Sequence, residues 1–97
     1  MPVTAFELNF SGATIEQYDQ VISMMGFEPR GRAAPDSLFH WVSKTDDGLK
    51  VVDVWESAEA FQAFADSQIG PFTQQAGMPE PQITAYPVYN YLVGGGS

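Results

Sequence analysis

The stretch Leu49–Gly70, LKVVDVWESAEAFQAFADSQIG, predicts a buried strand, a capped turn and an amphipathic helix in a single run. Its first eight residues are rich in Val with Leu and Trp, a composition that suits a strand buried on both faces. Ser57 is placed to cap the helix, and an acid two residues later suits the positive end of the helix dipole. Helical spacing then predicts one largely apolar stripe, made of Phe61, Phe64, Ala65, Gln68 and Ile69.

One residue departs from the apolar pattern of this strand. Asp53 lies between Val52 and Val54. A carboxylate in a buried strand needs a partner or a polar cavity, because burying the charge alone is costly. Asp53 is therefore the first candidate functional residue.

Composition limits the classes of protein to consider. The chain has 97 residues, which predicts one domain over residues 1–93, and residues 94–97 (GGGS) resemble a linker or tag remnant. Twelve acidic residues against four Lys and Arg give a net charge of −8, which disfavours nucleic acid and anionic membranes as partners. Cysteine is absent, which excludes disulfides and thiolate chemistry. No leader or long apolar run is evident, so we expect a cytoplasmic protein.

The first half of the chain predicts a strand, a helix and a hairpin. Strict alternation over residues 3–10 indicates a strand, and Thr14 with Gln17 forms a capping box before a helix over residues 15–25 that ends at Gly26. Residues 27–36 contain two prolines and both arginines and predict a loop. A strand over residues 37–44 follows, and Asp47-Gly48 predicts a hairpin turn into the next strand.

The second half predicts a helix and a final strand. We expect Gly70 and Pro71 to interrupt the second helix, which resumes over residues 72–76. The last strand is expected over residues 82–92, where Pro87 indicates an edge position or a bulge. The order is βαββαβ, an α+β ferredoxin-like arrangement with a four-stranded antiparallel sheet and two helices on one face.

With this order and the segment Asp53-Val54-Trp55-Glu56-Ser57, the chain resembles the dimeric α/β-barrel superfamily over residues 2–92. That superfamily includes antibiotic-biosynthesis-type monooxygenases, haem-degrading monooxygenases and polyketide cyclases. The resemblance implies a homodimer whose two sheets pack face to face, with a ligand cavity between sheet and helices in each subunit. An apolar content of 44% independently favours self-association, because one small sheet would otherwise expose an apolar face.

The hairpin brings the only histidine near Asp53. A two-residue or a four-residue loop places His40 on the same face as Asp53, and the four-residue loop makes them direct neighbours, whereas a three-residue loop separates them. On one interpretation Asp53 orients His40 as a base for proton transfer. On the other, the two residues form a polar pair that only fills space, or the histidine is exposed.

Aromatic and apolar residues are the candidates for binding a small apolar or aromatic molecule. Tyr18 and Tyr86 are candidates to orient a ligand through their hydroxyl groups. The expected lining is Phe6, Leu8, Trp55, Phe61 and Phe64, joined by Trp41 and Phe72, although these residues also suit a plain core. Arg30 and Arg32 either guard the pocket mouth for an anionic substrate or are solvated charges.

We expect neither a metal nor another cofactor. One histidine and scattered acids lack the spacing of metal ligands, and there is no glycine-rich phosphate loop. The resemblance implies a histidine on the second helix in the haem-degrading members and a histidine with a tyrosine in plant polyketide cyclases. This chain instead has Phe61, Phe64, Ser67 and Gln68 there, which argues against both activities.

The hypothesis that the resemblance favours is a cofactor-independent monooxygenase or a cyclase-like enzyme, acting on a small aromatic or polyketide-like molecule. The alternative is a non-enzymatic dimer that binds a small ligand or serves a structural role. A third hypothesis is a tautomerase that uses Pro2 as its amino-terminal base, because the tautomerase superfamily resembles this start of the chain.

Overall fold

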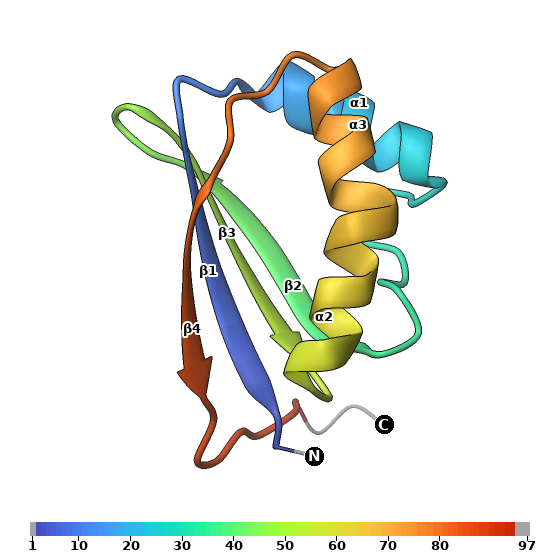
Figure 1. The fold of residues 1–97 in the computed structure, drawn as a ribbon, viewed down its shortest axis with the longest axis vertical. Coiled ribbons are helices and arrows are strands. Elements are labelled where there is room, and N and C mark those ends of the chain that lie inside the picture. The colour runs from blue at the N-terminus through green and yellow to red at the C-terminus, as the bar shows by residue number, and fades with distance from the viewer. Residues whose placement is uncertain (1, 95–97) are drawn as a thin grey trace.

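The computed structural model describes residues 2–94 and consists of a four-stranded antiparallel sheet with helices packed on one face (Figure 1). The sheet order is β2-β3-β1-β4. This arrangement confirms the ferredoxin-like βαββαβ prediction. Of the expected linker remnant, residues 95–97 lie outside the described part. The elements are β1 (Thr4–Ser11), α1 (Ile15–Met25), β2 (Ser37–Lys44), β3 (Gly48–Trp55), α2 (Ala58–Phe64), the π-helical turn η1 (Ala65–Ile69), α3 (Gly70–Gln75) and β4 (Gln82–Pro87).

Helix α1 begins and ends at the predicted signals. The Thr14 side chain accepts a hydrogen bond from the backbone N–H of Gln17, and the Gln17 side chain accepts one from the backbone N–H of Thr14. Gly26 ends the helix with a φ of 83°, a conformation that a residue without Cβ adopts at no steric cost. These caps fix the length of α1 and therefore the face it presents to the sheet.

The prediction of a break at Gly70 and Pro71 is wrong. Segments α2, η1 and α3 follow one another without a gap. Proline lacks an N–H, and its ring crowds the carbonyl four residues back, which disrupts ordinary helical geometry. The π-helical turn absorbs this defect: the N–H of Gly70 donates to the carbonyl of Ala65, five residues earlier. The result is one long helical run along the sheet.

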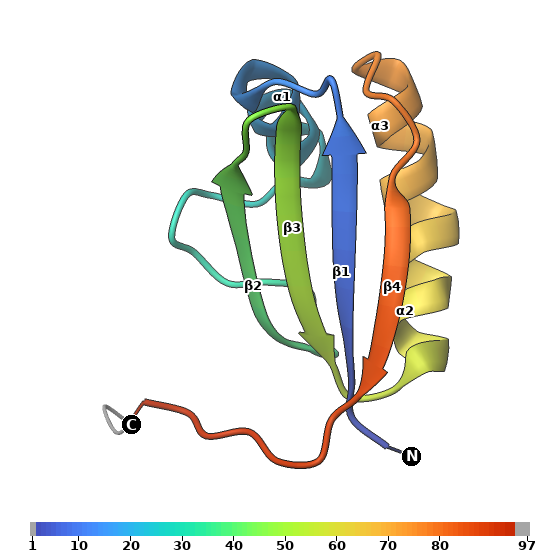
Figure 2. The ribbon, with the colours of Figure 1, turned by 90° about the vertical axis from the view of Figure 1, so that its left-hand side faces the viewer.

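Strand β4 is shorter than expected. It ends at Pro87 rather than at Leu92, because proline has no N–H to donate to the neighbouring strand. The last hydrogen bond to β1 follows directly, from the Val88 N–H to the Val3 carbonyl at 2.9 Å. The edge position predicted from Pro87 is confirmed, since β4 pairs only with β1. Beyond it the chain leaves the sheet as an arm with Tyr89 fully exposed (Figure 2).

The two faces of the sheet differ sharply. The face toward the helices carries the core, whose main members are Phe6, Leu8, Phe10, Leu49, Val51, Trp55 and Phe61. No helix of the described chain covers the other face (Figure 2). It exposes Phe39, Trp41 and Tyr86 by 64%, 42% and 48%. We call this surface the outer face.

Of the three loop lengths considered for the hairpin between β2 and β3, the structure has the four-residue loop. Lys44 pairs with Leu49, and the N–H of Thr45 donates to the carbonyl of Gly48 at 2.8 Å. Gly48 lies so close to β1 that a Cβ there would be 2.0 Å from the Phe10 carbonyl oxygen. The turn therefore needs glycine at this position, and it sets the pairing of every residue further along the two strands.

Candidate functional site

A chain of four polar side chains lies between the sheet and the helix layer. His40 pairs directly with Asp53 across β2 and β3, and its Nδ1 is 2.5 Å from the Asp53 Oδ1. On its other side, the His40 Nε2 is 2.5 Å from the Tyr18 hydroxyl on α1. The Trp55 Nε1–H donates to the second Asp53 oxygen at 3.2 Å. The site therefore joins β2, β3 and α1.

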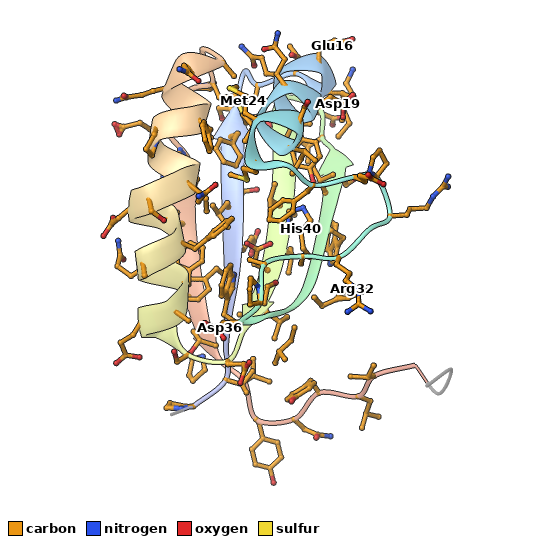
Figure 3. All side chains as sticks on the ribbon, turned by 90° about the vertical axis from the view of Figure 1, so that its right-hand side faces the viewer. Glu16, Asp19, Met24, Arg32, Asp36 and His40 are labelled. Atoms are coloured by element: carbon orange, nitrogen blue, oxygen red, sulfur yellow. The ribbon has the colours of Figure 1, made fainter. Side chains whose placement is uncertain are left out.

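The elements place these groups for simple reasons. Residues 53 and 55 are two apart on β3 and so share the helix-facing side of the sheet. Tyr18 lies one helical turn before Val21, which is buried in the core, so its side chain also faces the sheet. His40 is reached from the helix side, below α1 and beside the loop over residues 27–36 (Figure 3).

The hydrogen bonds define the tautomer of His40. An ionised carboxylate can only accept hydrogen bonds, so the Nδ1 that faces Asp53 carries a hydrogen. In the neutral imidazole the Nε2 is then an acceptor, and the Tyr18 hydroxyl donates to it. Asp53 is 5% exposed, and the His40 and Trp55 donors satisfy both of its oxygens. The buried acid predicted from the sequence thus has two partners.

Burial shapes the acidity of Tyr18. Burial, followed by the nearby carboxylates of Asp53 and Asp19, raises the pKa of the Tyr18 phenol to about 12. Both effects disfavour the phenolate, because a second negative charge would have to form in a partly desolvated place. At neutral pH Tyr18 is therefore a phenol that holds its hydrogen.

These polar groups line one cavity of about 880 Å³. Its size lies within the range of ligand pockets, roughly 300–1,000 Å³. Apolar residues form the wall between the strands and helices: Leu8, Phe10, Val21, Ile22, Met25, Val51, Trp55, Phe64, Ile69 and Met78. Such a wall suits a flat apolar molecule with one or two oxygens, because the hydrogen-bonded groups Tyr18, His40 and Asp53 lie together at one place in it.

Four of the nine predicted cavity or ligand-orienting residues line this cavity, and five, among them Phe72, do not. Leu8, Tyr18, Trp55 and Phe64 are part of its wall. Phe6 and Phe61 instead stack on each other, with ring centroids 3.8 Å apart, and both are buried in the core. Their assignment to the cavity is therefore wrong, because their rings fill the space between β1 and α2.

The prediction for Tyr86 is also wrong, because this residue lies on the outer face. It pairs with Ala5 of β1 and so points away from the helices. Its hydroxyl donates to Glu7 at 3.0 Å, which raises the pKa of the Tyr86 phenol. The hydrogen bonds to Glu7 from Asn9, Lys50 and Tyr86 lower the pKa of the Glu7 carboxyl. Trp41 lies on the outer face too, opposite Val52.

The loop over residues 27–36 supplies wall residues that the sequence did not single out, apart from its arginines. Residues 27–35 all line the cavity, and the loop lies on the same side of the sheet as the helices (Figure 1). Its length was the available signal, since long loops without secondary structure in small domains are often functional. The loop lies on the opposite side of the cavity from the long helical run of α2, η1 and α3 (Figure 3).

Both arginines lie in this loop wall. Arg30 has a φ of 59° as the third residue of a turn closed by a 2.9 Å bond from the Gly31 N–H to the Glu28 carbonyl. Over residues 2–94 no carboxylate lies within ion-pair distance of Arg30 or Arg32. Asp19 and Glu28 line the same cavity, so the wall carries both signs of charge.

Three further observations concern other kinds of site. Pro2 is exposed and does not line the cavity. Residues 2–94 contain no group of three His, Asp or Glu side chains arranged to hold a metal ion. Within that same range, every helix is too short or too polar to cross a membrane.

Comparisons with known proteins place the fold. No family model matches the sequence, and no curated protein matches it either. Among solved structures, the chain is similar to a variant of SnoaB, a cofactor-independent oxygenase from Streptomyces nogalater, with a TM-score of 0.63 and 13% identity over 95% of this chain and 98% of that one.

Two further structures are similar. One is a candidate antibiotic biosynthesis monooxygenase from Chloroflexus aurantiacus, with a TM-score of 0.58 and 19% identity over 95% of this chain and 99% of the other. The second is a candidate antibiotic biosynthesis monooxygenase from Deinococcus radiodurans, with a TM-score of 0.55 and 16% identity over 99% and 100%. This chain therefore has the ferredoxin-like fold of the antibiotic-biosynthesis-monooxygenase-like proteins.

Proposed function

We propose that the chain is a cofactor-independent monooxygenase that acts on a small aromatic or polyketide-like molecule. The observation that carries the proposal is the hydrogen-bonded chain from Tyr18 through His40 to Asp53 in the wall of an apolar cavity of about 880 Å³. A histidine oriented by a buried carboxylate is the usual form of a general base. The likeness to the oxygenase from Streptomyces nogalater points to the same reaction class.

The reaction needs the enzyme to do little beyond removing a proton. An aromatic ketone with a benzylic methylene group, such as anthrone, becomes an electron-rich enolate when it loses a proton. The enolate supplies the electrons that reduce dioxygen, and the methylene becomes a carbonyl with release of one water. Atoms and electrons balance for substrate plus dioxygen giving quinone plus water. The polar chain would take the proton, and the apolar wall would hold the flat rings.

The apolar surroundings also favour this chemistry. Contact with the apolar wall leaves a bound enolate less solvated and strengthens each hydrogen bond that the site directs at it. Trp55 and Phe64 contact each other, with ring centroids 5.1 Å apart, and both line the cavity. Their faces are suited to a fused aromatic ring by stacking or edge contact.

Dioxygen uptake with anthrone as the probe tests the proposal. We expect the protein to accelerate uptake and the formation of anthraquinone, and His40→Ala to abolish the acceleration. A matched control is Ser43→Ala, since Ser43 is an exposed residue of the same strand whose hydroxyl bonds only the neighbouring Lys44 carbonyl. If anthrone binds without turnover, and binds His40→Ala equally well, the chain is a ligand-binding protein instead.

We also propose that the protein is a homodimer through the outer face of its sheet. Phe39, Trp41 and Tyr86 form an exposed apolar surface around the ion pair of Glu7 and Lys50. Exposed apolar surface of this kind on a small sheet favours self-association. Two-fold pairing is the commonest arrangement of soluble oligomers.

Of the remaining hypotheses, the tautomerase has the least support. Pro2 is exposed, and the cavity wall does not include it, so an amino-terminal base would act away from the apolar site.

A further inference from the structure

His40 has no free nitrogen to offer a substrate. Its Nδ1 is 2.5 Å from Asp53, and its Nε2 is 2.5 Å from the Tyr18 hydroxyl. The Tyr18 and His40 rings are nearly parallel, with an angle of 7° between their planes. A substrate that loses a proton to His40 directly would first have to displace Tyr18 from a short hydrogen bond.

The direction of the hydrogen bonds decides what Tyr18 can do. With neutral His40, the only hydrogen of the Tyr18 hydroxyl points at Nε2, because Nδ1 carries the imidazole hydrogen toward Asp53. The phenol oxygen then has lone pairs that are not engaged by His40. Tyr18 lines the cavity, so this oxygen is the part of the polar chain suited to accept a hydrogen from a ligand.

We infer that Tyr18, rather than His40, is the catalytic residue that meets the substrate, and that it relays the substrate's proton to His40. This inference rests on the proposed function, because it names the atom that performs the proton abstraction proposed there. Trp55 and Asp53 act as positioning residues, since they reach the substrate's proton only through His40.

The step balances as one double transfer. The C–H bond of the substrate breaks, its electron pair stays on the substrate as an enolate, and the proton joins the Tyr18 oxygen. At the same time the Tyr18 O–H bond breaks and its proton joins the His40 Nε2. The products are the enolate, a neutral tyrosine and an imidazolium hydrogen-bonded to Asp53. No electron leaves the substrate in this step.

The transfer also reverses the polarity of Tyr18. An imidazolium carries hydrogens on both nitrogens, so the Nε2–H now donates to the Tyr18 oxygen. The phenol hydrogen is then free to turn toward the cavity and to donate to the new enolate. The Tyr18 hydroxyl is therefore a hydrogen-bond acceptor before proton abstraction and a donor afterwards. As a donor it stabilises the negative charge that forms on the enolate oxygen.

The surroundings of Tyr18 favour a concerted relay over a stored phenolate. Tyr18 is partly buried, and the carboxylates of Asp53 and Asp19 act on it. A free phenolate beside two carboxylates is disfavoured, so the phenol should never lose its proton without receiving another. The short bond to Nε2 supplies the path along which one proton leaves as the other arrives.

The test separates proton abstraction from oxygenation by excluding dioxygen. Anthrone is incubated with the protein in heavy water without oxygen, and exchange of its methylene hydrogens is followed by NMR. We expect the protein to accelerate exchange and Tyr18→Phe to lower that acceleration by roughly 100-fold or more, the usual contribution of a positioned acid or base. The matched control Tyr89→Phe alters a fully exposed tyrosine and should exchange anthrone at the wild-type rate.

Binding of anthraquinone, followed by the change in tryptophan fluorescence, shows whether Tyr18→Phe still holds the ligand. Unchanged affinity with lost exchange supports the relay, because a merely structural role would lower both. Exchange by Tyr18→Phe at or above the wild-type rate would overturn the inference, since it would show that uncovering the His40 Nε2 is enough. A wild-type protein that catalyses exchange without oxygen uptake would retain the relay and refute the proposed monooxygenase. Absence of exchange in the wild type would overturn the relay.

Discussion

His40 and Asp53 lie directly opposite each other on β2 and β3, with the histidine Nδ1 2.5 Å from the aspartate Oδ1. The aspartate is buried, whereas the His40 side chain is 28% exposed. Asp53 therefore depends on His40 and Trp55 for its hydrogen bonds, while His40 has partial access to solvent. This difference predicts that the two residues respond differently to substitution.

Removing His40 alone should cost more stability than removing both partners. His40→Leu leaves the buried Asp53 carboxylate with one hydrogen-bond donor, Trp55. We expect this to lower the free energy of unfolding by roughly 2 kcal/mol. The loss should be smaller than the 3–5 kcal/mol of a fully buried ion pair, because His40 is partly exposed. The double variant with Asp53→Leu removes the orphaned charge and should be more stable than His40→Leu. Urea unfolding of the two single variants and the double variant measures this. Additive free-energy changes would show that the pair is not coupled.

Ionisation of Tyr18 should couple to folding at high pH. Its folded pKa of about 12 lies above the unfolded value near 10, so the native state holds the proton more tightly. The stability from this difference is present below about pH 10 and is lost as the pH rises toward 12. Denaturant unfolding of wild type and Tyr18→Phe should therefore show a free-energy difference that changes only in that window.

A spectroscopic control accompanies this prediction. The absorbance of tyrosinate should show a step near pH 12 that Tyr18→Phe removes and Tyr89→Phe keeps. Retention of the step in Tyr18→Phe would mean that Tyr18 ionises at an ordinary pH.

The outer face should hold two copies together. We expect light scattering at micromolar concentration to give twice the chain mass, and Trp41→Glu to shift the protein to monomers by placing a charge on the apolar face. Gln75→Glu adds the same charge at an exposed position of α3 and should remain dimeric. A wild-type monomer at these concentrations would contradict the proposed homodimer.

Two neighbouring phenylalanines of α2 should behave differently. Phe61 is 3% exposed and stacks on Phe6, so Phe61→Ala should cost about 3–5 kcal/mol of unfolding free energy. Phe64 is only partly buried and lines the cavity, so Phe64→Ala should cost less and change the affinity for anthraquinone instead. Equal destabilisation by both variants would mean that Phe64 belongs to the core.

The sequence predicted most of the fold because its signals are local. Capping residues mark α1, alternation marks β1, and Asp47-Gly48 marks the hairpin. The pairing of His40 with Asp53 followed from one of three possible loop lengths. The structure selects the four-residue loop, in which Gly48 must approach the Phe10 carbonyl closely. That contact comes from β1, far along the chain, and no local pattern reveals it.

Two of these failures come from non-local packing, and the third comes from a local change in helix geometry. The prediction that Tyr86 orients a ligand in the cavity fails because its face depends on the register between β4 and β1, which places it opposite Ala5. The contact of Tyr18 with His40 depends on the packing of α1 over β2, and helical spacing alone shows only that Tyr18 faces the sheet. The continuity of the second helix depends on a π-helical turn, which the amino-acid composition of the segment does not predict.

The most direct test of the site is the NMR spectrum of the imidazole, which is simple to assign because the chain has a single histidine. The account predicts that in the neutral form of the imidazole Nδ1 carries a strongly deshielded, slowly exchanging hydrogen bonded to Asp53. It also predicts that Nε2 is an unprotonated acceptor whose nitrogen shift changes in Tyr18→Phe. A hydrogen on Nε2 of the neutral ring, or a His40 spectrum unaltered by both Tyr18→Phe and Asp53→Asn, would contradict the Tyr18–His40–Asp53 chain.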